Sequence, residues 1–249
     1  MQEKLYSPLL HERIRMKNRV IIVGGGAAGM LASVFCSKKK AVKSRFFEKN
    51  EKLGKKLYLQ EKGACNVTNN CDPEELLNSV VTNAKFLYSA FYTFTSQDMM
   101  DFLEEAGTAL KTERGNRVFP CSDRSSDIIR ALERQMKKYG VQIRLKSQVQ
   151  KLLVEEGKVT GISLTDGSVH RAEGVIVATG GLSYPTTGST GDGYRFAREA
   201  GHTVTDLSPS LVPLHTKEDY IPEMAGLSLK NVELTVKNGK KSFIGILGR

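Results

Sequence analysis

Cysteine is scarce in this chain, and long apolar runs are absent from it. Only four cysteines occur in 249 residues, too few for a disulfide scaffold. No stretch reaches the roughly 18 to 20 apolar residues that a membrane span needs. The first 18 residues also lack the continuous apolar core of a signal peptide. The sequence therefore predicts a cytoplasmic protein that is neither secreted nor membrane-inserted. Reduced thiols are expected at Cys36, Cys65, Cys71 and Cys121.

Acidic residues are outnumbered, since 27 Asp and Glu stand against 37 Lys and Arg and leave a net charge of +10. Such a charge suggests a nucleic-acid partner. The surplus is local, however: residues 1–60 hold 14 basic and 4 acidic residues, and residues 61–249 hold 23 of each. A nucleic-acid partner is therefore not expected, and an RNA-associated protein is ranked last among the alternatives.

Histidine is also sparse, and no arrangement of side chains typical of a metal or hydrolytic site is present. The four histidines are scattered without metal-ligand spacing: His11, His170, His202 and His215. Cys65 and Cys71 could form a redox dithiol, but neither has an evident base beside it, so a reduced structural pair is expected. No metal is expected, and no catalytic residue is assigned.

A glycine-rich turn lies between a strand and a helix near the start of the chain. Arg19–Val23 is a β-branched run typical of a buried parallel strand, and residues 27–37 have the composition of an apolar helix. Gly24, Gly26 and Gly29 lie at this junction. Dinucleotide-binding domains use this spacing for the tight turn, the close approach of a pyrophosphate and helix–strand packing. The free N–H groups of such a helix favour phosphate.

Glu48 follows a second expected strand, Arg45–Phe47, and lies 19 residues beyond Gly29. A carboxylate at this point accepts hydrogen bonds from ribose hydroxyls and repels a 2′-phosphate. The pattern therefore favours FAD or NAD over NADP. The alternative is a glycine-rich turn with a surface glutamate, and the strand–turn–helix–strand order argues against it.

Lysines follow Glu48 closely. Lys49, Lys55 and Lys56 can place ammonium groups beside the phosphates of a dinucleotide. The alternative is a solvated basic loop, and for Lys55 and Lys56 the charge pattern does not separate the two interpretations.

The remaining apolar patterns predict a helical middle and a strand-rich second half. Helices are expected at 73–77, 84–92, 97–105 and 126–139. Short strands are expected at 110–112 and 117–119. A meander is expected from four strands, at 141–145, 149–155, 159–165 and 168–171. A buried strand at 174–178, a helix from the 188–193 glycine cluster to about 200, and a strand at 232–236 complete the pattern.

Two further glycine clusters mark places where the backbone approaches another group closely. Gly180 and Gly181 end the expected buried strand, and Gly188–Gly193 opens the last helix. Asp192 in this cluster is either a simple acid at a helix N-terminus or a neighbour of the cofactor.

Five stretches of the chain resemble one flavoprotein family. They are VIIVGGGAAGM at 20–30, EKNEKLGKKL at 48–57, CNVTN at 65–69, VFPCSDRSSDI at 118–128 and ATGGLSYPTTGSTGDGY at 178–194. Together they resemble the BaiN-like, aminoacetone-oxidase-like family of NAD(P)/FAD-dependent oxidoreductases, over residues 19 to about 236. The last stretch together with CNVTN is far more specific than the glycine fingerprint.

The resemblance implies an α/β fold with a Rossmann-like, glutathione-reductase-type domain that binds FAD. It also implies a smaller strand-rich domain inserted after a Leu-Val-Pro-Leu segment, here 211–214. The residues that it implies at the pyrophosphate are Gly24, Gly26, Ala27, Ala28 and Gly29. It implies Glu48 at the adenosine ribose and Val149 near the adenine. It implies Lys56, Asn66 and Thr68 on the flavin side and Ala178, Thr179 and Gly180 close to the cofactor. Lys49, Gly191 and Asp192 are further candidate cofactor-binding residues from their own motifs.

The chain departs from the family pattern at two places. The Arg that usually precedes the Cys of CNVTN is Ala64 here, and Lys62 is the nearest cation that could substitute for it. The chain also ends inside the expected insertion, which suggests C-terminal truncation. We therefore expect an N-terminal extension at 1–18 (with Met16 an alternative start), an FAD domain at 19–207 and an incomplete inserted domain at 208–249.

The sequence thus predicts an FAD-dependent oxidoreductase acting on a small organic substrate, with NADH or NADPH as a plausible electron donor. The first alternative is a truncated, catalytically inactive flavoprotein fragment. The second alternative is an RNA-associated flavoprotein.

Overall fold

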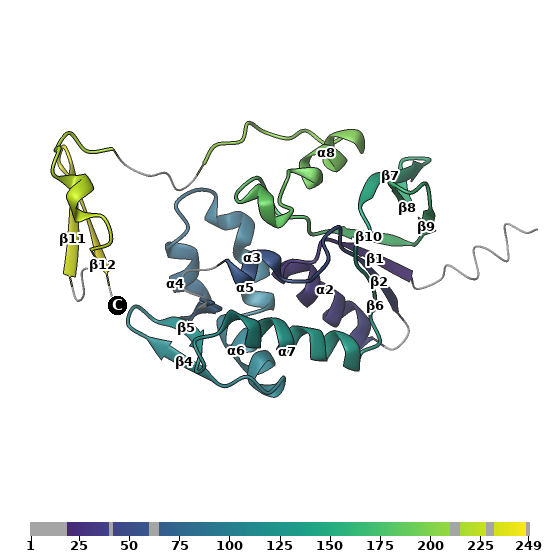
Figure 1. Cartoon of the computed structure of the whole chain (residues 1–249), viewed down its shortest axis with the longest axis horizontal. Helices are drawn as coiled ribbons and strands as arrows, with labels where there is room; N and C mark the ends of the chain where they lie inside the picture. The colour runs from purple at the N-terminus through teal and green to yellow at the C-terminus, as the bar shows by residue number, and fades with distance from the viewer. Residues whose placement is uncertain (1–18, 40–41, 60–64, 210–214, 228–231, 248–249) are drawn as a thin grey trace, which may run out of the picture.

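The computed structural model describes residues 19–39, 42–59, 65–209, 215–227 and 232–247. They form an α/β fold around one parallel sheet, and smaller antiparallel sheets complete the described residues (Figure 1). The expected arm at 1–18, the 211–214 segment, Lys62 and Ala64 lie outside the described residues. None of the described helices is long and apolar enough to cross a bilayer.

The parallel sheet contains the strand–turn–helix–strand unit that the sequence predicts. Its strand order is β10 (Gly174–Val177), β1 (Arg19–Val23), β2 (Lys43–Phe47) and β6 (Gln142–Arg144), all paired in parallel. The central strand β1 is β-branched, and both faces of a parallel sheet are usually covered. The predicted strand–helix–strand unit is confirmed, with β1 and β2 parallel and joined by α2 (Ala27–Lys38).

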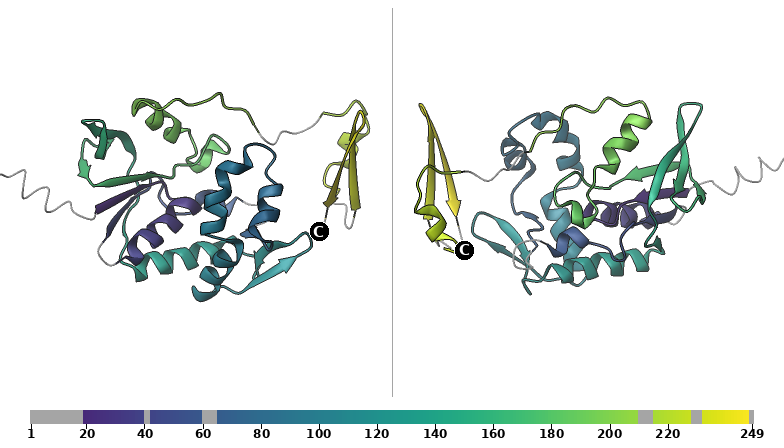
Figure 2. Two further views of the ribbon diagram at one scale, coloured as in Figure 1. Left: turned by 180° about the vertical axis from the view of Figure 1, so that it is seen from behind. Right: turned by 45° about the horizontal axis from the view of Figure 1, so that its top comes forward.

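Different elements cover the two faces of this sheet. Helices α2 and α7 (Ser125–Lys138) pack on one face, where Ile22, Met30 and Phe46 are fully buried (Figures 1 and 2). An antiparallel meander packs on the other face, where Ile21 and Phe47 are buried. Successive strand residues point to opposite faces, so the two neighbouring isoleucines belong to different hydrophobic clusters.

The meander has three strands rather than the expected four. It consists of β7 (Val149–Glu155), β8 (Lys158–Leu164) and β9 (Val169–Arg171). The expected first strand, 141–145, instead forms β6 and pairs in parallel with β2. The prediction was wrong because the sequence of a three-residue strand does not indicate which strand it will pair with. The preceding Val141 packs in the cluster under α7 and directs the strand to the sheet edge.

The middle of the chain is helical, as predicted, and carries a small antiparallel sheet. The helices are α3 (Lys55–Tyr58), α4 (Pro73–Asn78), η2 (Ala84–Leu87), α5 (Tyr88–Thr93) and α6 (Ser96–Glu105). A capping box between Thr95 and Asp98 begins α6. The sheet has the order β3 (Thr68–Asn69), β5 (Arg117–Pro120) and β4 (Leu110–Glu113).

The last described elements follow β10. The sequence predicts β10 as a buried strand. In the structure it lies at the sheet edge and is only half-buried, and its last residue, Val177, is 38% exposed. After it come η3 (Pro185–Thr187), α8 (Asp192–Glu199) and η4 (Ile221–Met224). The predicted strand at 232–236 is confirmed as β11 (Val232–Asn238), and it pairs with β12 (Lys241–Leu247), which the sequence analysis did not predict.

Gly24 is expected to tolerate no side chain. Its φ is +111°, and a Cβ there would overlap the carbonyl of Ala178 across the sheet. Gly24→Ala is therefore expected to lower the free energy of unfolding by about 2–3 kcal/mol in urea denaturation. Gly174→Ala on β10 is the matched control: nothing lies within 4 Å of its added Cβ, so its effect should stay within about 0.5 kcal/mol. Equal effects of the two substitutions would contradict this role of Gly24.

Candidate functional site

A cavity of about 340 Å³ opens where the parallel strands β1 and β2 end. Crevices at the carboxyl ends of the strands are the usual ligand sites of such sheets. Five segments line it: the β1–α2 turn, the end of β2 with α3, the start of β7, the end of β10 and the loop before α8. The predicted cofactor residues in its lining are Gly24, Gly26, Ala27, Ala28, Glu48, Lys49, Lys56, Val149, Ala178, Thr179, Gly180 and Asp192.

The N-terminus of α2 faces this cavity without an internal partner. Its N-cap is Gly26, which has no side chain, and the first turn holds no acidic residue. The first N–H groups of a helix have no intrahelical acceptor, and the helix dipole adds a partial positive charge there. A Cβ at Gly26 would meet nothing within 4 Å, so the space before this helix end is open. The arrangement suits a phosphate group.

Glu48 is buried, with 6% of its surface exposed, and each carboxylate oxygen accepts a backbone N–H. Oε1 accepts the N–H of Asn50 at 2.7 Å, and Oε2 accepts a short hydrogen bond from the N–H of Gly25. A Cβ at Gly25 would lie 2.5 Å from Oε2, so this glycine permits the contact. Each oxygen has a second lone pair, so the carboxylate keeps the capacity to accept two further hydrogen bonds from a diol.

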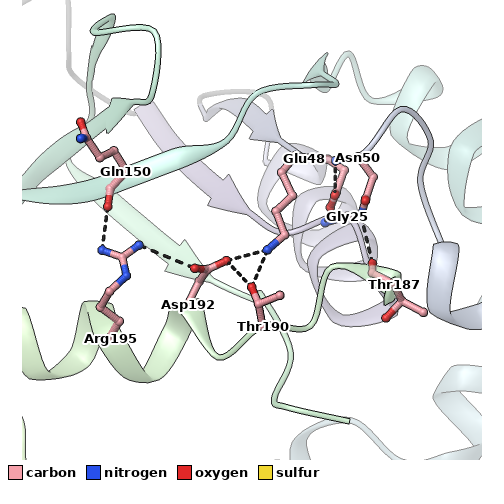
Figure 3. A network of polar contacts seen from close by, with 9 residues as sticks. Gly25, Glu48, Asn50, Gln150, Thr187, Thr190, Asp192 and Arg195 are labelled. Atoms are coloured by element: carbon pink, nitrogen blue, oxygen red, sulfur yellow. Dashed lines mark hydrogen bonds and ion pairs between the residues drawn. The ribbon is translucent and has the colours of Figure 1, made fainter. Parts of the chain in front are cut away.

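An ion pair joins the end of β2 to the glycine-rich loop before α8 (Figure 3). The Nζ of Lys49 lies 2.7 Å from Oδ2 of Asp192 and donates to the Thr190 hydroxyl at 2.7 Å. Arg195 extends the network, since it lies 3.7 Å from Asp192 and donates to the Gln150 carbonyl on β7. The Lys49 ammonium is therefore balanced by a carboxylate before any ligand is considered.

The pKa of Asp192 lies below its ordinary value. Burial alone would raise it, but the Lys49 hydrogen bond and charge, with smaller contributions from Thr190 and Arg195, outweigh burial. Asp192 is thus ionised at neutral pH. Lys56, in contrast, forms no ion pair within the described ranges, so its charge at the cavity wall is not offset.

The Thr179 hydroxyl lies at the end of β10, is fully buried and has no hydrogen-bond partner. Thr179 lines the cavity, and the backbone of Gly193 packs against its Oγ1 so closely that a Cβ there would lie 2.8 Å away. Gly180 has a φ of +74°, and a Cβ there would lie 2.8 Å from the hydroxyl oxygen of the buried Ser189. A buried polar atom without a partner costs free energy, and a ligand in the cavity is the natural partner for it.

Four predicted cofactor residues do not line the cavity. Gly29 lies inside the fold, where the α2 backbone packs on the carbonyl of Gly24. Asn66 is exposed, and the Thr68 hydroxyl contacts Ser96 at 3.1 Å in the small sheet. Gly191 caps α8 in a left-handed conformation. Their proposed cofactor contacts remain predictions.

Several residues that line the cavity were not predicted from the sequence. They are Val23, Gly25, Phe47, Asn50, Lys52, Leu57, Ser147, Gln148, Thr187, Gly188, Ser189 and Phe196, together with Lys55, whose role was left open. Gly25 and Gly188 lie within glycine clusters that the sequence displays. Ser147 and Gln148 follow a short strand whose partner the pattern did not reveal, so no local signal marked them.

Within the described residues, no cysteine or histidine lines the cavity. Burial raises the pKa of the Cys65 thiol to about 11, so it is protonated at neutral pH. The His170 ring packs 4.8 Å from Phe47, and burial, with Arg144 and Arg45 nearby, lowers the pKa of His170. The described part of the chain holds no group of His, Cys, Asp and Glu that could bind a metal ion.

The fold and the site define a Rossmann-type domain with a cavity at the carboxyl ends of its parallel strands. The model of the HI0933-like protein Rossmann domain matches residues 18–242. The chain therefore belongs to the HI0933-like family, and the flavoprotein resemblance drawn from its motifs is confirmed.

Curated relatives carry two different names. A 3-dehydro-bile acid delta(4,6)-reductase of Clostridium scindens is 30% identical over 212 residues, which cover 84% of this chain and 50% of the relative. A ribosomal RNA dihydrouridine synthase of Haemophilus influenzae is 30% identical over 235 residues, 91% of this chain and 56% of the relative. The chain thus spans about half the length of the curated relatives that it matches.

Solved structures share the fold at low sequence identity. A 3-ketosteroid delta1-dehydrogenase of Sterolibacterium denitrificans matches with a TM-score of 0.56 and 15% identity, over 74% of this chain and 55% of that one. A flavocytochrome c3 fumarate reductase matches with a TM-score of 0.53 and 21% identity, over 81% and 45%. Both support the Rossmann-type architecture and nothing finer.

The Lys49–Asp192 pair is expected to stabilise the fold in a pH-dependent way. Asp192→Asn should lower the free energy of unfolding at pH 7 by about 1 kcal/mol, because the ion pair is partly buried. A carboxyl with a lowered folded-state pKa contributes stability above its unfolded pKa and loses it as the pH falls through the folded value. The difference from the native chain should therefore shrink as the pH falls below about 4.

Urea denaturation across this pH range measures the effect. Asp206→Asn, at an exposed position, is the control and should change stability at neither pH. An Asp192→Asn effect of the same size at pH 7 and at acid pH would contradict an ionised partner for Lys49.

Proposed function

We propose that this chain is the FAD-binding part of an FAD-dependent oxidoreductase. One observation carries the proposal: the uncapped N-terminus of α2 and the buried Glu48 carboxylate face the same cavity. A dinucleotide needs both features, since its pyrophosphate is an anion and its adenosine ribose is a diol. The family membership supports FAD as the dinucleotide.

The residues present fit this cofactor at several points. The amides of Ala27 and Ala28, at the first turn of α2, would hold the pyrophosphate, and the Glu48 carboxylate would accept the ribose hydroxyls. Val149 is 6% exposed and offers an apolar wall for the adenine. The partnerless Thr179 hydroxyl gains a partner when a polar ligand fills the cavity.

The bound FAD would supply the hydride or electron chemistry. The names of the curated relatives favour reduction of a carbon–carbon double bond conjugated to a carbonyl group. A 3-dehydro-bile acid delta(4,6)-reductase reduces such bonds beside a ring ketone, and forming dihydrouridine reduces the corresponding bond of uracil. Our proposal for this chain is therefore an activated-alkene reductase of a small organic substrate, with NADH or NADPH as the donor.

RNA is the second candidate substrate class, because two curated relatives are named ribosomal RNA dihydrouridine synthases. The expectation that nucleic acid is not a partner has no support from the comparisons and stays a prediction. The domain limits at 19–207 and 208–249, a cytoplasmic location and a catalytically silent fragment also remain proposals. No described residue is assigned as catalytic acid or base.

The FAD proposal predicts a yellow protein whose flavin depends on Glu48. Glu48→Gln should weaken FAD binding about 10- to 100-fold, because the charged acceptor of two ribose hydrogen bonds is replaced by an amide. Flavin absorbance during equilibrium dialysis measures the dissociation constant. Glu51→Gln is the control, since the Glu51 side chain is 54% exposed and does not line the cavity. A native chain that retains no flavin, or an unchanged Glu48→Gln, would contradict the proposal.

Thr179→Val separates ligand binding from folding. The substitution replaces a hydroxyl that has no partner by a methyl group of similar shape. The ligand-free chain should therefore keep or gain stability in thermal denaturation, whereas its FAD affinity should fall about fivefold or more. Loss of stability without loss of FAD affinity would show that the hydroxyl has a structural role instead.

A further inference from the structure

One face of the parallel sheet carries basic side chains on three adjacent strands. Arg19 lies on β1, Lys43 and Arg45 lie on β2, and Arg144 lies on β6. We call these four residues the basic sheet face. The strand register places all of them on the side where the meander packs, because Arg45 pairs with Ile21 and Arg144 pairs with Phe47. Lys43 and Arg144 are exposed beside the meander, and Arg19 and Arg45 are half-buried.

The register also places like charges beside each other. Arg19 and Lys43 are direct cross-strand partners, and like charges at such positions destabilise a sheet. Arg45 lies between Arg19 and Arg144, close enough to both for their charges to act on it. Burial, then these two charges, lower the pKa of Arg45, although the guanidinium stays charged at neutral pH.

Glu173, just before β10, lies opposite Arg19, but no ion pair within the described residues reaches Lys43, Arg45 or Arg144. Other arginines on the same side do form ion pairs. Glu155 pairs with Arg171, and Asp166 is held by the hydroxyl and N–H of Ser168. His170, the remaining titratable neighbour, has a lowered pKa and adds no negative charge. The sheet therefore holds a repulsive cluster that an anionic ligand would relieve.

The shape of the cluster favours a chain of anions over a single one. Neighbouring strands lie about 5 Å apart, so the side chains of the basic sheet face form a row across three strands. Guanidinium groups bind phosphate oxygens in a bidentate manner. The row reaches the rim of the cofactor cavity, because the Arg144 carbonyl accepts the N–H of Glu48 at 2.9 Å and Phe47 lines the cavity.

We propose that the basic sheet face binds the phosphodiester backbone of an RNA strand beside the cofactor cavity. As a substrate-binding surface it rests on the second candidate of the proposed function, and it would hold an RNA whose uracil base is reduced at the flavin. Backbone contacts of this kind position a nucleic acid without reading its sequence. Arg19, Lys43 and Arg45 belong to the basic first quarter of the chain but do not line the cofactor cavity.

Fluorescence anisotropy with a single-stranded RNA of about 20 nucleotides tests the proposal. The triple variant Arg19→Gln, Arg45→Gln, Arg144→Gln should bind at least about tenfold more weakly than the native chain at low salt. Between about 50 and 200 mM salt, its log–log salt slope should be shallower by about 2, which corresponds to three lost phosphate contacts. The matched control removes the same charge from three exposed positions elsewhere: Lys85→Gln, Lys137→Gln, Arg198→Gln. It should keep the native slope to within about 1.

The single variant Arg45→Gln tests whether lost RNA binding reflects misfolding. The substitution removes charge repulsion, so the melting temperature of this variant should equal or exceed that of the native chain. RNA should raise the melting temperature of the native chain and have a smaller effect on this variant. Equal losses in the triple variant and its control would overturn the proposal. So would absent RNA binding at low salt, or binding only to vesicles of anionic phosphatidylserine.

Flavin absorbance separates this inference from the proposed function. The triple variant should retain FAD, since none of its three positions lines the cavity. A yellow native chain that ignores RNA would overturn the RNA surface and leave the FAD proposal standing. A colourless chain that still binds RNA through this face would overturn the FAD proposal, and with it the link between RNA binding and reduction.

Discussion

The Glu48 carboxylate fastens the glycine-rich turn to the neighbouring strand, and the shape of the cavity depends on that attachment. Its two oxygens accept the N–H groups of Gly25 and Asn50. The buried carboxylate therefore joins the turn after β1 to the segment after β2. A buried carboxylate is tolerated only when it is well hydrogen-bonded. With Gly25 fixed in this way, the following residues present the uncapped end of α2 to the cavity. The same oxygens retain the lone pairs that a ribose requires.

Much of this arrangement could be predicted from the sequence because its signals are local. The β-branched Arg19–Val23 run, the glycine spacing and the acid after the second strand occur within 30 residues, and each has one structural meaning in that order. The predicted helices of the middle are recovered for the same reason, since apolar spacing and caps mark them. Twelve of the predicted cofactor residues lie in one cavity, including Thr179 and Asp192 from the second half of the chain.

The failures concern pairing and position in the sheet, which no local pattern encodes. Residues 141–145 have the pattern of any short strand, and only packing against α7 sends them to the parallel sheet rather than to the meander. The apolar strand β10 was expected to be buried because its composition is that of a central strand, yet it lies at the sheet edge. The distribution of charge along the chain likewise located a basic quarter. It could not separate the lysines at the cavity from the arginines on the sheet.

The Lys49–Thr190 contact has a consequence for the order of events during synthesis and folding. Its two residues are 141 positions apart in the sequence, and they belong to segments that line different parts of the cavity, the end of β2 and the loop before α8. Closing so long a loop is entropically costly, and such contacts form slowly compared with the local β1–α2–β2 unit. Synthesis must therefore proceed past Asp192 before this cavity can close. Until then the Gly24 turn, the Glu48 carboxylate and the end of α2 are present without the wall that encloses a ligand. A dinucleotide would therefore bind in this cavity only after the two distant segments of the chain have come together.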